Sequence, residues 1–141
     1  MSTSGSKKIL VTGGCGYIGS HTITDLYANG FDIVTIDNNL RSKPETVSLI
    51  EKISGRKPKH YAVDLCDKAA VKAVFDAEQG FAGVIHFAAL KSVPESVEKP
   101  LLYYRNNLDS LLILIELCIE YGVNDFVFSS SCSVYGNISK L

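Results

Sequence analysis

The sequence lacks an excess of charge of either sign. Its 141 residues carry 14 Lys+Arg against 15 Asp+Glu, a formal net charge of −1. Such a chain has no electrostatic field to hold a polyanion, so we expect no nucleic-acid partner. It also lacks a CxxC pair, because its four cysteines stand apart at positions 15, 66, 118 and 132. This spacing argues against a metal site or a disulfide framework and favours reduced thiols.

Long apolar segments are missing as well. The longest apolar run, residues 111–119, is interrupted by Glu116 and is much shorter than the ~20 residues that span a bilayer. The first eight residues, MSTSGSKK, have no apolar stretch typical of a secretory signal. With 46% apolar residues, the chain has enough apolar surface to build a core. We expect a folded, soluble, cytoplasmic chain with no membrane partner.

Short apolar runs alternate regularly with stretches of helical periodicity. The runs predict strands over residues 9–12, 32–36, 60–65, 83–88 and 126–129. Between them, apolar side chains recur at helical spacing and predict three inward faces: Ile18, Thr22 and Leu26; Val71, Val74 and Phe75; Leu108, Leu111, Leu112, Ile115 and Ile119. This alternation predicts an α/β fold with a doubly wound parallel sheet, in the strand order 3-2-1-4-5.

The ends of the predicted helices carry suitable residues. Gly30 and Gly122 suit helix C-termini, Asp67 suits an N-cap, and Pro100 suits a first helical turn. The last helix is apolar nearly all round, so we expect one side on the sheet and the other on a second helix or a partner chain. The fifth strand comes so late in the sequence that its edge has no cover, and we expect a chain truncated after it.

A glycine-rich segment follows the first predicted strand. Residues 7–19 read KKILVTGGCGYIG, in which Gly13, Gly16 and Gly19 are spaced as in dinucleotide-binding loops. A diphosphate binds bare backbone N–H groups at a helix N-terminus, and a Cβ on the loop would hold it away. The strand before and the helix after favour this interpretation over a ligand-free turn.

Two carboxylates follow the next two strands. Asp37 comes eighteen residues after Gly19, where an acid accepts the ribose hydroxyls of NAD and repels the 2′-phosphate of NADP. Arg41 and Lys43 lie close by in the sequence and could receive such a phosphate, so both dinucleotides stay open. Asp64 follows the third strand and suits either the adenine amino group or a helix cap.

Four segments resemble the UDP-glucose 4-epimerases, a group of NAD-dependent enzymes in the extended short-chain dehydrogenase/reductases and the epimerase/dehydratase family. They are ILVTGGCGYIGSH (9–21), HFAALKSVPESVEKP (86–100), YYRNN (103–107) and FVFSSSCSVYG (126–136). The resemblance implies that residues 1–141 are an N-terminal NAD-binding Rossmann domain, without the catalytic helix and the substrate domain. It also implies a homodimer for the intact protein.

The resemblance implies a role for individual residues too. For NAD it implies Gly13, Gly16, Tyr17, Ile18, Gly19, Asp37, Asn38, Ser42, Asp64, Leu65, Phe87, Ala88, Ala89, Lys91 and Asn106. For the UDP-sugar it implies Lys91, Ser131, Cys132 and Ser133. Ser131 matches the catalytic serine that bonds the reacting sugar hydroxyl.

The implied reaction inverts C4 of a UDP-hexose through a 4-keto intermediate and interconverts UDP-glucose and UDP-galactose. It needs a base, which is a tyrosine of a Y-x-x-x-K motif in these enzymes, and this sequence has no such motif. We assign no catalytic role to the three histidines. A nucleotide-sugar dehydratase is the first alternative, although Cys132 and Ser133 stand where dehydratases carry an Asp-Glu pair. A non-catalytic NAD-binding module is the second.

Overall fold

The computed structural model describes residues 6–136, the side chains of residues 132 and 133 excepted. Its strands are β1 (Lys8–Thr12), β2 (Asp32–Ile36), β3 (Lys59–Tyr61), β4 (Phe81–His86) and β5 (Asp125–Phe128). Its helices are α1 (Tyr17–Ala28), α2 (Thr46–Ser54), α3 (Lys68–Glu78), α4 (Val93–Glu98), α5 (Pro100–Tyr104) and α6 (Ser110–Glu120), with a π-helical turn η1 (Arg105–Asp109) and a 3₁₀ turn η2 (Cys132–Tyr135).

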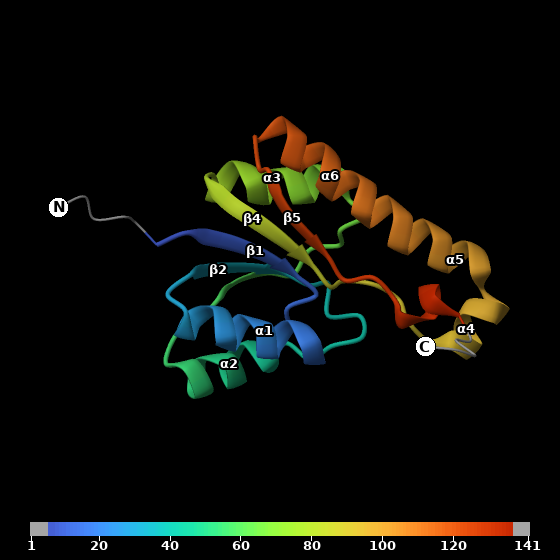
Figure 1. Ribbon diagram of the computed structural model, residues 1–141, viewed down its shortest axis with the longest axis horizontal. Helices are drawn as coiled ribbons and strands as arrows, with labels where there is room; N and C mark the ends of the chain where they lie inside the picture. Colours follow the sequence, from blue (N-terminus) through green and yellow to red (C-terminus); the bar gives the residue numbers. More distant parts are fainter. Residues whose placement is uncertain (1–5, 137–141) are drawn as a thin grey trace.

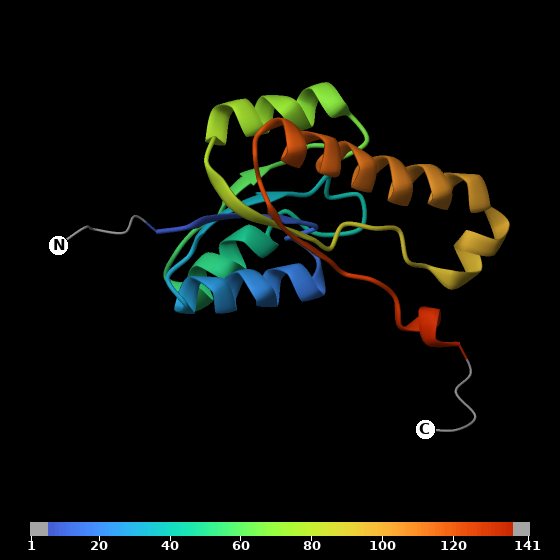
Figure 2. The same ribbon diagram turned by 45° about the horizontal axis from the view of Figure 1, so that its top comes forward.

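The five strands form one parallel sheet in the order β3-β2-β1-β4-β5, which confirms the predicted topology. Helices α1 and α2 cover one face of the sheet, and α3 and α6 cover the other (Figures 1 and 2). The strand order reverses between β1 and β4, where crevices open in doubly wound sheets. Among residues 6–136, no helix is long and apolar enough to cross a membrane.

Successive side chains of a strand enter opposite halves of the core, because strand side chains alternate between the two faces. Leu10 packs with α3 and α6, in the cluster that contains Phe75 and Leu114. Its neighbour Val11 packs with α1 and α2, in the cluster that contains Ile23 and Ile50. Burial on both faces explains why the central strands read as continuous apolar runs.

The first and fifth strands lie within one residue of the predicted bounds, and two others end earlier than predicted. The third covers Lys59–Tyr61 instead of residues 60–65, because its ladder with β2 ends at the Ile36–Tyr61 pair. The fourth covers Phe81–His86 instead of residues 83–88, since β1 offers no partner beyond the Thr12–His86 pair. The residues that follow both strands are therefore loops at the carboxyl edge of the sheet.

The inward face of α1 differs from the predicted one by a single position. Its buried residues are Gly19, Ile23 and Tyr27, whereas Ile18 is 54% exposed. Gly19 sets this rotation, because a Cβ there would lie 2.3 Å from the carbonyl oxygen of Gly13. Once Gly19 faces the loop, helical spacing brings the residues four and eight positions later onto the sheet.

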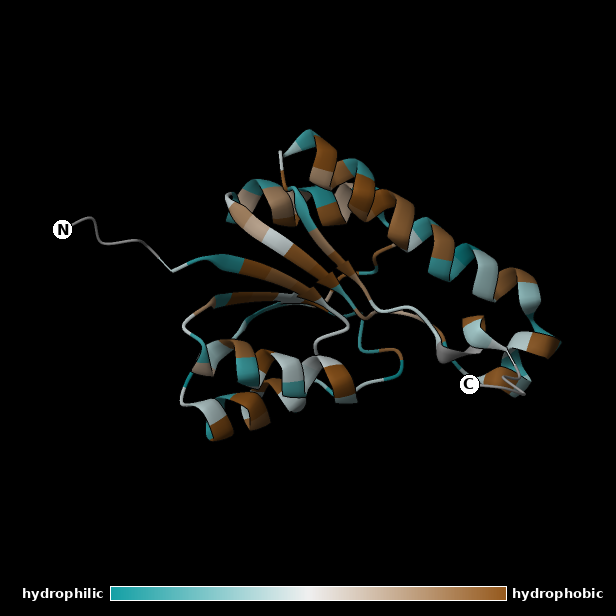
Figure 3. Ribbon diagram, in the orientation of Figure 1, coloured by the Kyte–Doolittle hydropathy of each residue, from teal (hydrophilic) through white to brown (hydrophobic). Residues whose placement is uncertain are grey.

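The predicted inward face of α6 was wrong. Four of its members are exposed: Leu108, Leu112, Ile115 and Ile119. The buried residues are Ser110, Leu114, Leu117 and Cys118. Periodicity could not select a face on a helix that is apolar along most of its surface (Figure 3). The observed rotation buries Leu114, Leu117 and Cys118 in the core cluster, and it also brings Glu116 and Glu120 to exposed ion pairs with Lys68 and Lys72 of α3.

The predicted helix ends are confirmed. The Asp67 carboxylate accepts the N–H of Ala70 at 3.0 Å and caps α3. Gly30 and Gly122 follow α1 and α6 with φ of 83° and 68°, the left-handed region that glycine adopts without strain. Pro100 is the first residue of α5.

Candidate dinucleotide-binding site

A cleft of about 890 Å³ opens at the carboxyl ends of the strands. Every residue expected to contact NAD lines this cleft, and Ser131 lines it too. Arg41, which the sequence offered as a possible phosphate contact, lines the cleft as well. The lining also includes nine residues that were not predicted: Leu40, Val63, His86, Leu90, Asn107, Ser110, Phe128, Ser129 and Ser130. The site residues are therefore together, at the switch point of the sheet.

The glycine loop between β1 and α1 is packed too tightly for side chains. Gly13 has φ +69°, and a Cβ there would lie 2.8 Å from the backbone nitrogen of Ala88. A Cβ on Gly14 would overlap the side chain of Thr35. At Gly16, a Cβ would meet only the carbonyl oxygen of Gly13, at 3.2 Å. The first two glycines therefore serve packing, and Gly16 leaves the side toward the cleft open.

The N-terminus of α1 opens into the cleft and suits an anion. Its N-cap is Gly16, which has no side chain to accept a hydrogen bond, and its first turn contains no acid. Gly16, Tyr17, Ile18 and Gly19 all line the cleft. Because the first N–H groups of a helix lack intrahelical acceptors and carry partial positive charge, this end favours a diphosphate.

Asp37 directly follows β2, and protein donors hold its carboxylate at the cleft wall. One oxygen accepts the N–H of Cys15 at 3.0 Å. The other accepts the N–H of Asn39 at 2.9 Å and the hydroxyl of Ser42 at 2.8 Å. A carboxylate offers about four lone-pair positions, so these three bonds leave capacity for a ribose hydroxyl. Asp37 thus stabilises its own loop, as a turn aspartate does, and also lines the cleft.

A polar cluster beneath this loop was not predicted. Asn39 has φ 56°, and its side-chain nitrogen lies 3.3 Å from Nε2 of His60. Nδ1 of His60 lies 4.0 Å from Sγ of Cys15. Burial lowers the pKa of His60, against the opposing effect of Asp37, and burial together with Asp37 raises the pKa of Cys15 to about 12. Both groups are therefore neutral supports for the loop that carries Asp37.

Asp64 and Leu65 form part of the cleft wall beyond β3. The carboxylate of Asp64 accepts the N–H of Cys66 at 2.9 Å, so it closes a turn, and the cap of α3 is Asp67 instead. Leu65 is buried in the core. Both residues line the cleft, a position that suits an adenine base.

Asn107 positions the loop that follows β4. Its side-chain oxygen accepts the N–H of Leu90 at 2.8 Å, and its side-chain nitrogen donates to the carbonyl oxygen of Leu90 at 2.9 Å. Its neighbour Asn106, which was predicted, donates to the same oxygen of Asn107 at 2.9 Å. Both lie in the π-helical turn η1, a geometry often found at functional sites. The pair therefore holds the loop from Phe87 to Lys91 against the cleft.

His86 at the end of β4 is a neutral structural residue. It is 2% exposed, and its Nδ1 lies 2.7 Å from the hydroxyl of Thr12. Its ring stacks on Phe128 with the centroids 5.9 Å apart. Burial lowers the pKa of His86 to about 4, which leaves it uncharged at neutral pH.

The residues expected near the sugar lie at the other end of the cleft. Lys91 and Ser131 both line it, Lys91 after β4 and Ser131 after β5. Cys132 and Ser133 belong to η2, and their side chains lie outside the described part of the structure. Ser129, where the fifth strand was predicted to end, and Ser130 complete the lining here.

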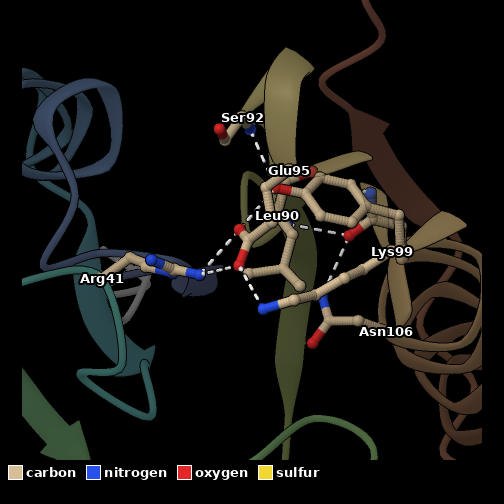
Figure 4. A network of polar contacts seen from close by, with 8 residues as sticks. Arg41, Leu90, Ser92, Glu95, Lys99 and Asn106 are labelled. Carbon is tan, nitrogen blue, oxygen red and sulfur yellow. Dashed lines mark hydrogen bonds and ion pairs between the residues drawn. The ribbon is translucent and has the colours of Figure 1, made fainter. Parts of the chain in front are cut away.

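A network of polar side chains joins the loop after β2 to the segment around α4 (Figure 4). Arg41 donates through Nη2 to both carboxylate oxygens of Glu95, at 2.8 and 2.7 Å. The hydroxyl of Tyr103 donates to Glu95 at 2.8 Å and accepts the N–H of Ser92 at 3.1 Å. The hydrogen bond from Tyr103 and the charge of Arg41 lower the pKa of the Glu95 carboxyl.

Together, the doubly wound sheet, the side-chain-free loop, the uncapped helix and the acid after β2 define a dinucleotide-binding Rossmann domain. The chain matches the NAD dependent epimerase/dehydratase family over residues 9–140. It therefore belongs to this family.

Proteins similar to this chain include UDP-glucose 4-epimerases. The chain is 52% identical over 132 residues to UDP-glucose 4-epimerase uge1 of Schizosaccharomyces pombe; the match covers 94% of this chain and 37% of that relative. The UDP-glucose 4-epimerase of Bifidobacterium longum, solved with NAD+ and UDP, is similar with a TM-score of 0.91 and 43% identity, over 96% of this chain and 40% of the other. The UDP-glucose-4-epimerase of Stenotrophomonas maltophila, solved with bound NAD and formylated UDP-arabinopyranose, is similar with a TM-score of 0.90 and 38% identity. This match covers 95% of this chain and 40% of the other.

Proposed function

We propose that residues 1–141 are the N-terminal NAD-binding part of an enzyme that interconverts UDP-glucose and UDP-galactose. The observation that carries this proposal is the convergence of all expected cofactor residues and Ser131 on one cleft. Similarity to solved UDP-glucose 4-epimerases with bound NAD supports it.

The residues of the cleft fit NAD. The amides at the start of α1 suit the diphosphate, and Gly16 leaves room for it. The Asp37 carboxylate retains capacity for the adenosine ribose, with Asn38 beside it. Asp64 and Leu65 suit the adenine, and Phe87, Ala88, Ala89, Lys91 and Asn106 suit the nicotinamide half. NAD bound in this cleft would supply the acceptor, and in its reduced form the donor, of the hydride at C4 of the hexose.

The chain's own residues orient the sugar for this reaction. Ser131 bonds the reacting hydroxyl, while Lys91, Cys132 and Ser133 contribute to the sugar subsite. Asn107 fixes the backbone of Leu90 and thereby the position of Lys91. Proton removal from the hydroxyl needs a base, and the 141 residues contain no Y-x-x-x-K motif. We therefore expect the chain alone to convert no UDP-sugar, and we expect it to bind NAD weakly at best.

A homodimer is part of the same proposal. The exposed stripe of Leu108, Leu112, Ile115 and Ile119 follows one side of the helix, and apolar stripes of this kind mark association surfaces. A two-fold bundle of such helices would cover it.

A cytoplasmic enzyme of galactose metabolism is the setting that we propose. Cys15, Cys66 and Cys118 are free thiols, which suits a reducing compartment.

A chimera tests the proposed function directly. Residues of this chain replace the aligned N-terminal segment of the S. pombe relative, over the 132 matched residues. We expect the chimera to convert UDP-galactose to UDP-glucose in a coupled dehydrogenase assay. Ser131→Ala in the chimera should lower kcat about 100-fold, the size expected for loss of one hydrogen bond to the reacting oxygen.

Asp25→Ala is the matched control for the chimera, because Asp25 is exposed on α1 and far along the helix from the cleft. This variant should keep full activity. A folded chimera that carries NAD and yet converts neither UDP-sugar would contradict the proposed function.

A further inference from the structure

A positively charged side chain lines the cleft at the place where an NADP-specific site would need one. Arg41 lines the cleft with Asp37 and Ser42, four residues after the acid that the proposed function places on the adenosine ribose. An arginine at this place in a Rossmann fold accommodates the 2′-phosphate of NADP. Arg41 nevertheless coexists with Asp37, which repels that phosphate.

The guanidinium of Arg41 is already engaged. Its Nη2 bonds both oxygens of Glu95, which comes from α4, 54 residues later in the sequence. Figure 4 shows Arg41 extending from the β2 side toward this carboxylate. The side chain of Glu95 is 20% exposed and that of Arg41 59%, so the acid is the better fixed partner.

Tyr103 holds Glu95 in place. Its hydroxyl donates to Oε2 of Glu95 and accepts the N–H of Ser92, so α5 and the start of α4 both orient the carboxylate. Lys99 adds a longer ion pair to Oε1 at 3.8 Å. The Glu95 carboxylate is thus preorganised to accept hydrogen bonds from Arg41, and it competes with any phosphate for this guanidinium.

We propose that Glu95 determines cofactor specificity: it withholds Arg41 from the 2′-phosphate of NADP and so reinforces the selection of NAD by Asp37. Tyr103 is the positioning residue for Glu95. This inference rests on the proposed function, because it assumes that the adenosine ribose lies at Asp37.

The test compares the Kd values of NAD⁺ and NADP⁺ by saturation-transfer NMR, which detects weak binding, for the 141-residue chain and its variants. Glu95→Gln retains the shape of the side chain. In this variant we expect the affinity for NADP⁺ relative to NAD⁺ to rise about fivefold, the size expected when one exposed ion pair is released. Arg41→Ala should abolish this gain in the double variant. Tyr103→Phe should shift the ratio in the same direction by a smaller factor.

Lys99→Ala is the matched control, since it removes a partner of Glu95 without releasing Arg41, and it should leave the ratio unchanged. Thermal melts of each variant show that the fold is retained. If Glu95→Gln binds NAD⁺ normally but the ratio does not move, the inference is wrong and the proposed function stands. If the unaltered chain binds no dinucleotide at all, the inference loses its premise that the adenosine ribose lies at Asp37, whereas the chimera decides the proposed function.

Discussion

Single residues of this chain serve the fold and the site at the same time. Asp37 closes its own loop through Asn39 and Ser42 and still faces the cleft. Gly19 allows α1 to pack closely against the glycine loop and thereby sets the buried face of the helix. Substitutions at such positions affect both stability and binding, so the variants need readouts of each.

Gly19→Ala is expected to destabilise the fold. Its Cβ would lie 2.3 Å from the oxygen of Gly13 and 2.8 Å from Cα of Gly14, and backbone cannot give way cheaply. We expect a loss of about 2 kcal/mol in the free energy of unfolding, as for overpacked sites, measured by urea denaturation. Asp25→Ala on the exposed side of α1 should change it by less than about 0.5 kcal/mol. Equal stability of the two variants would refute the packing role of Gly19.

His86 makes the stability of the fold depend on pH. Burial lowers its pKa from 6.5 to about 4, so between these values the unfolded chain binds a proton that the folded chain does not. Stability is therefore full above pH 6.5 and falls as the pH decreases toward 4, by up to about 3 kcal/mol. Urea unfolding across this range should show the slope, and His86→Asn should reduce it. An unchanged slope in the variant would assign the effect to other groups.

At the scale of elements, the sequence predicts the order and type of the strands better than the faces of the helices. Continuous apolar runs with glycine punctuation indicate a parallel sheet, because both faces of its strands are buried. The rotation of α1 depends on one backbone contact at Gly19. That of α6 depends on the packing of Leu114 and Leu117 with residues far away in the sequence, such as Phe75 of α3. Periodicity contains neither kind of information.

The same distinction applies to the site. Glycine spacing and the acid after β2 are local patterns with a direct physical cause, so they could be recognised in the sequence. Asn107, His60 and the pair of Arg41 with Glu95 act through contacts between distant segments. Asn107 adjoins the predicted Asn106, and Arg41 lies four residues after Asp37, but the sequence does not show what either contacts.

Opposite sides of the α6 region should respond differently to substitution. Ile119 is 77% exposed and Leu117 is fully buried. We expect the unaltered chain to self-associate in sedimentation velocity, and Ile119→Lys to reduce association without loss of stability. Leu117→Ala should cost about 2–5 kcal/mol in urea unfolding, as for large core truncations. A monodisperse monomer that Ile119→Lys leaves unchanged would contradict the association surface.

At the scale of the whole molecule, the sheet brings five separate loops to one edge. The loops after all five strands line the cleft. Because the loops of the cleft come together only in the folded chain, a ligand there should raise the free energy of unfolding, and this gain should grow with the logarithm of the ligand concentration above its Kd. The central claim is that this ligand is a dinucleotide whose diphosphate lies at the N-terminus of α1.

The most direct measurement is a ¹H–¹⁵N NMR titration of the chain with NAD⁺. The account predicts the largest amide shifts at Gly16, Tyr17 and Ile18, with a second group around Asp37. It also predicts that the first group responds to inorganic diphosphate alone, because it binds only that part of the ligand. Amides at the start of α1 that stay unchanged at saturating NAD⁺, or shifts confined to another face of the sheet, would contradict it.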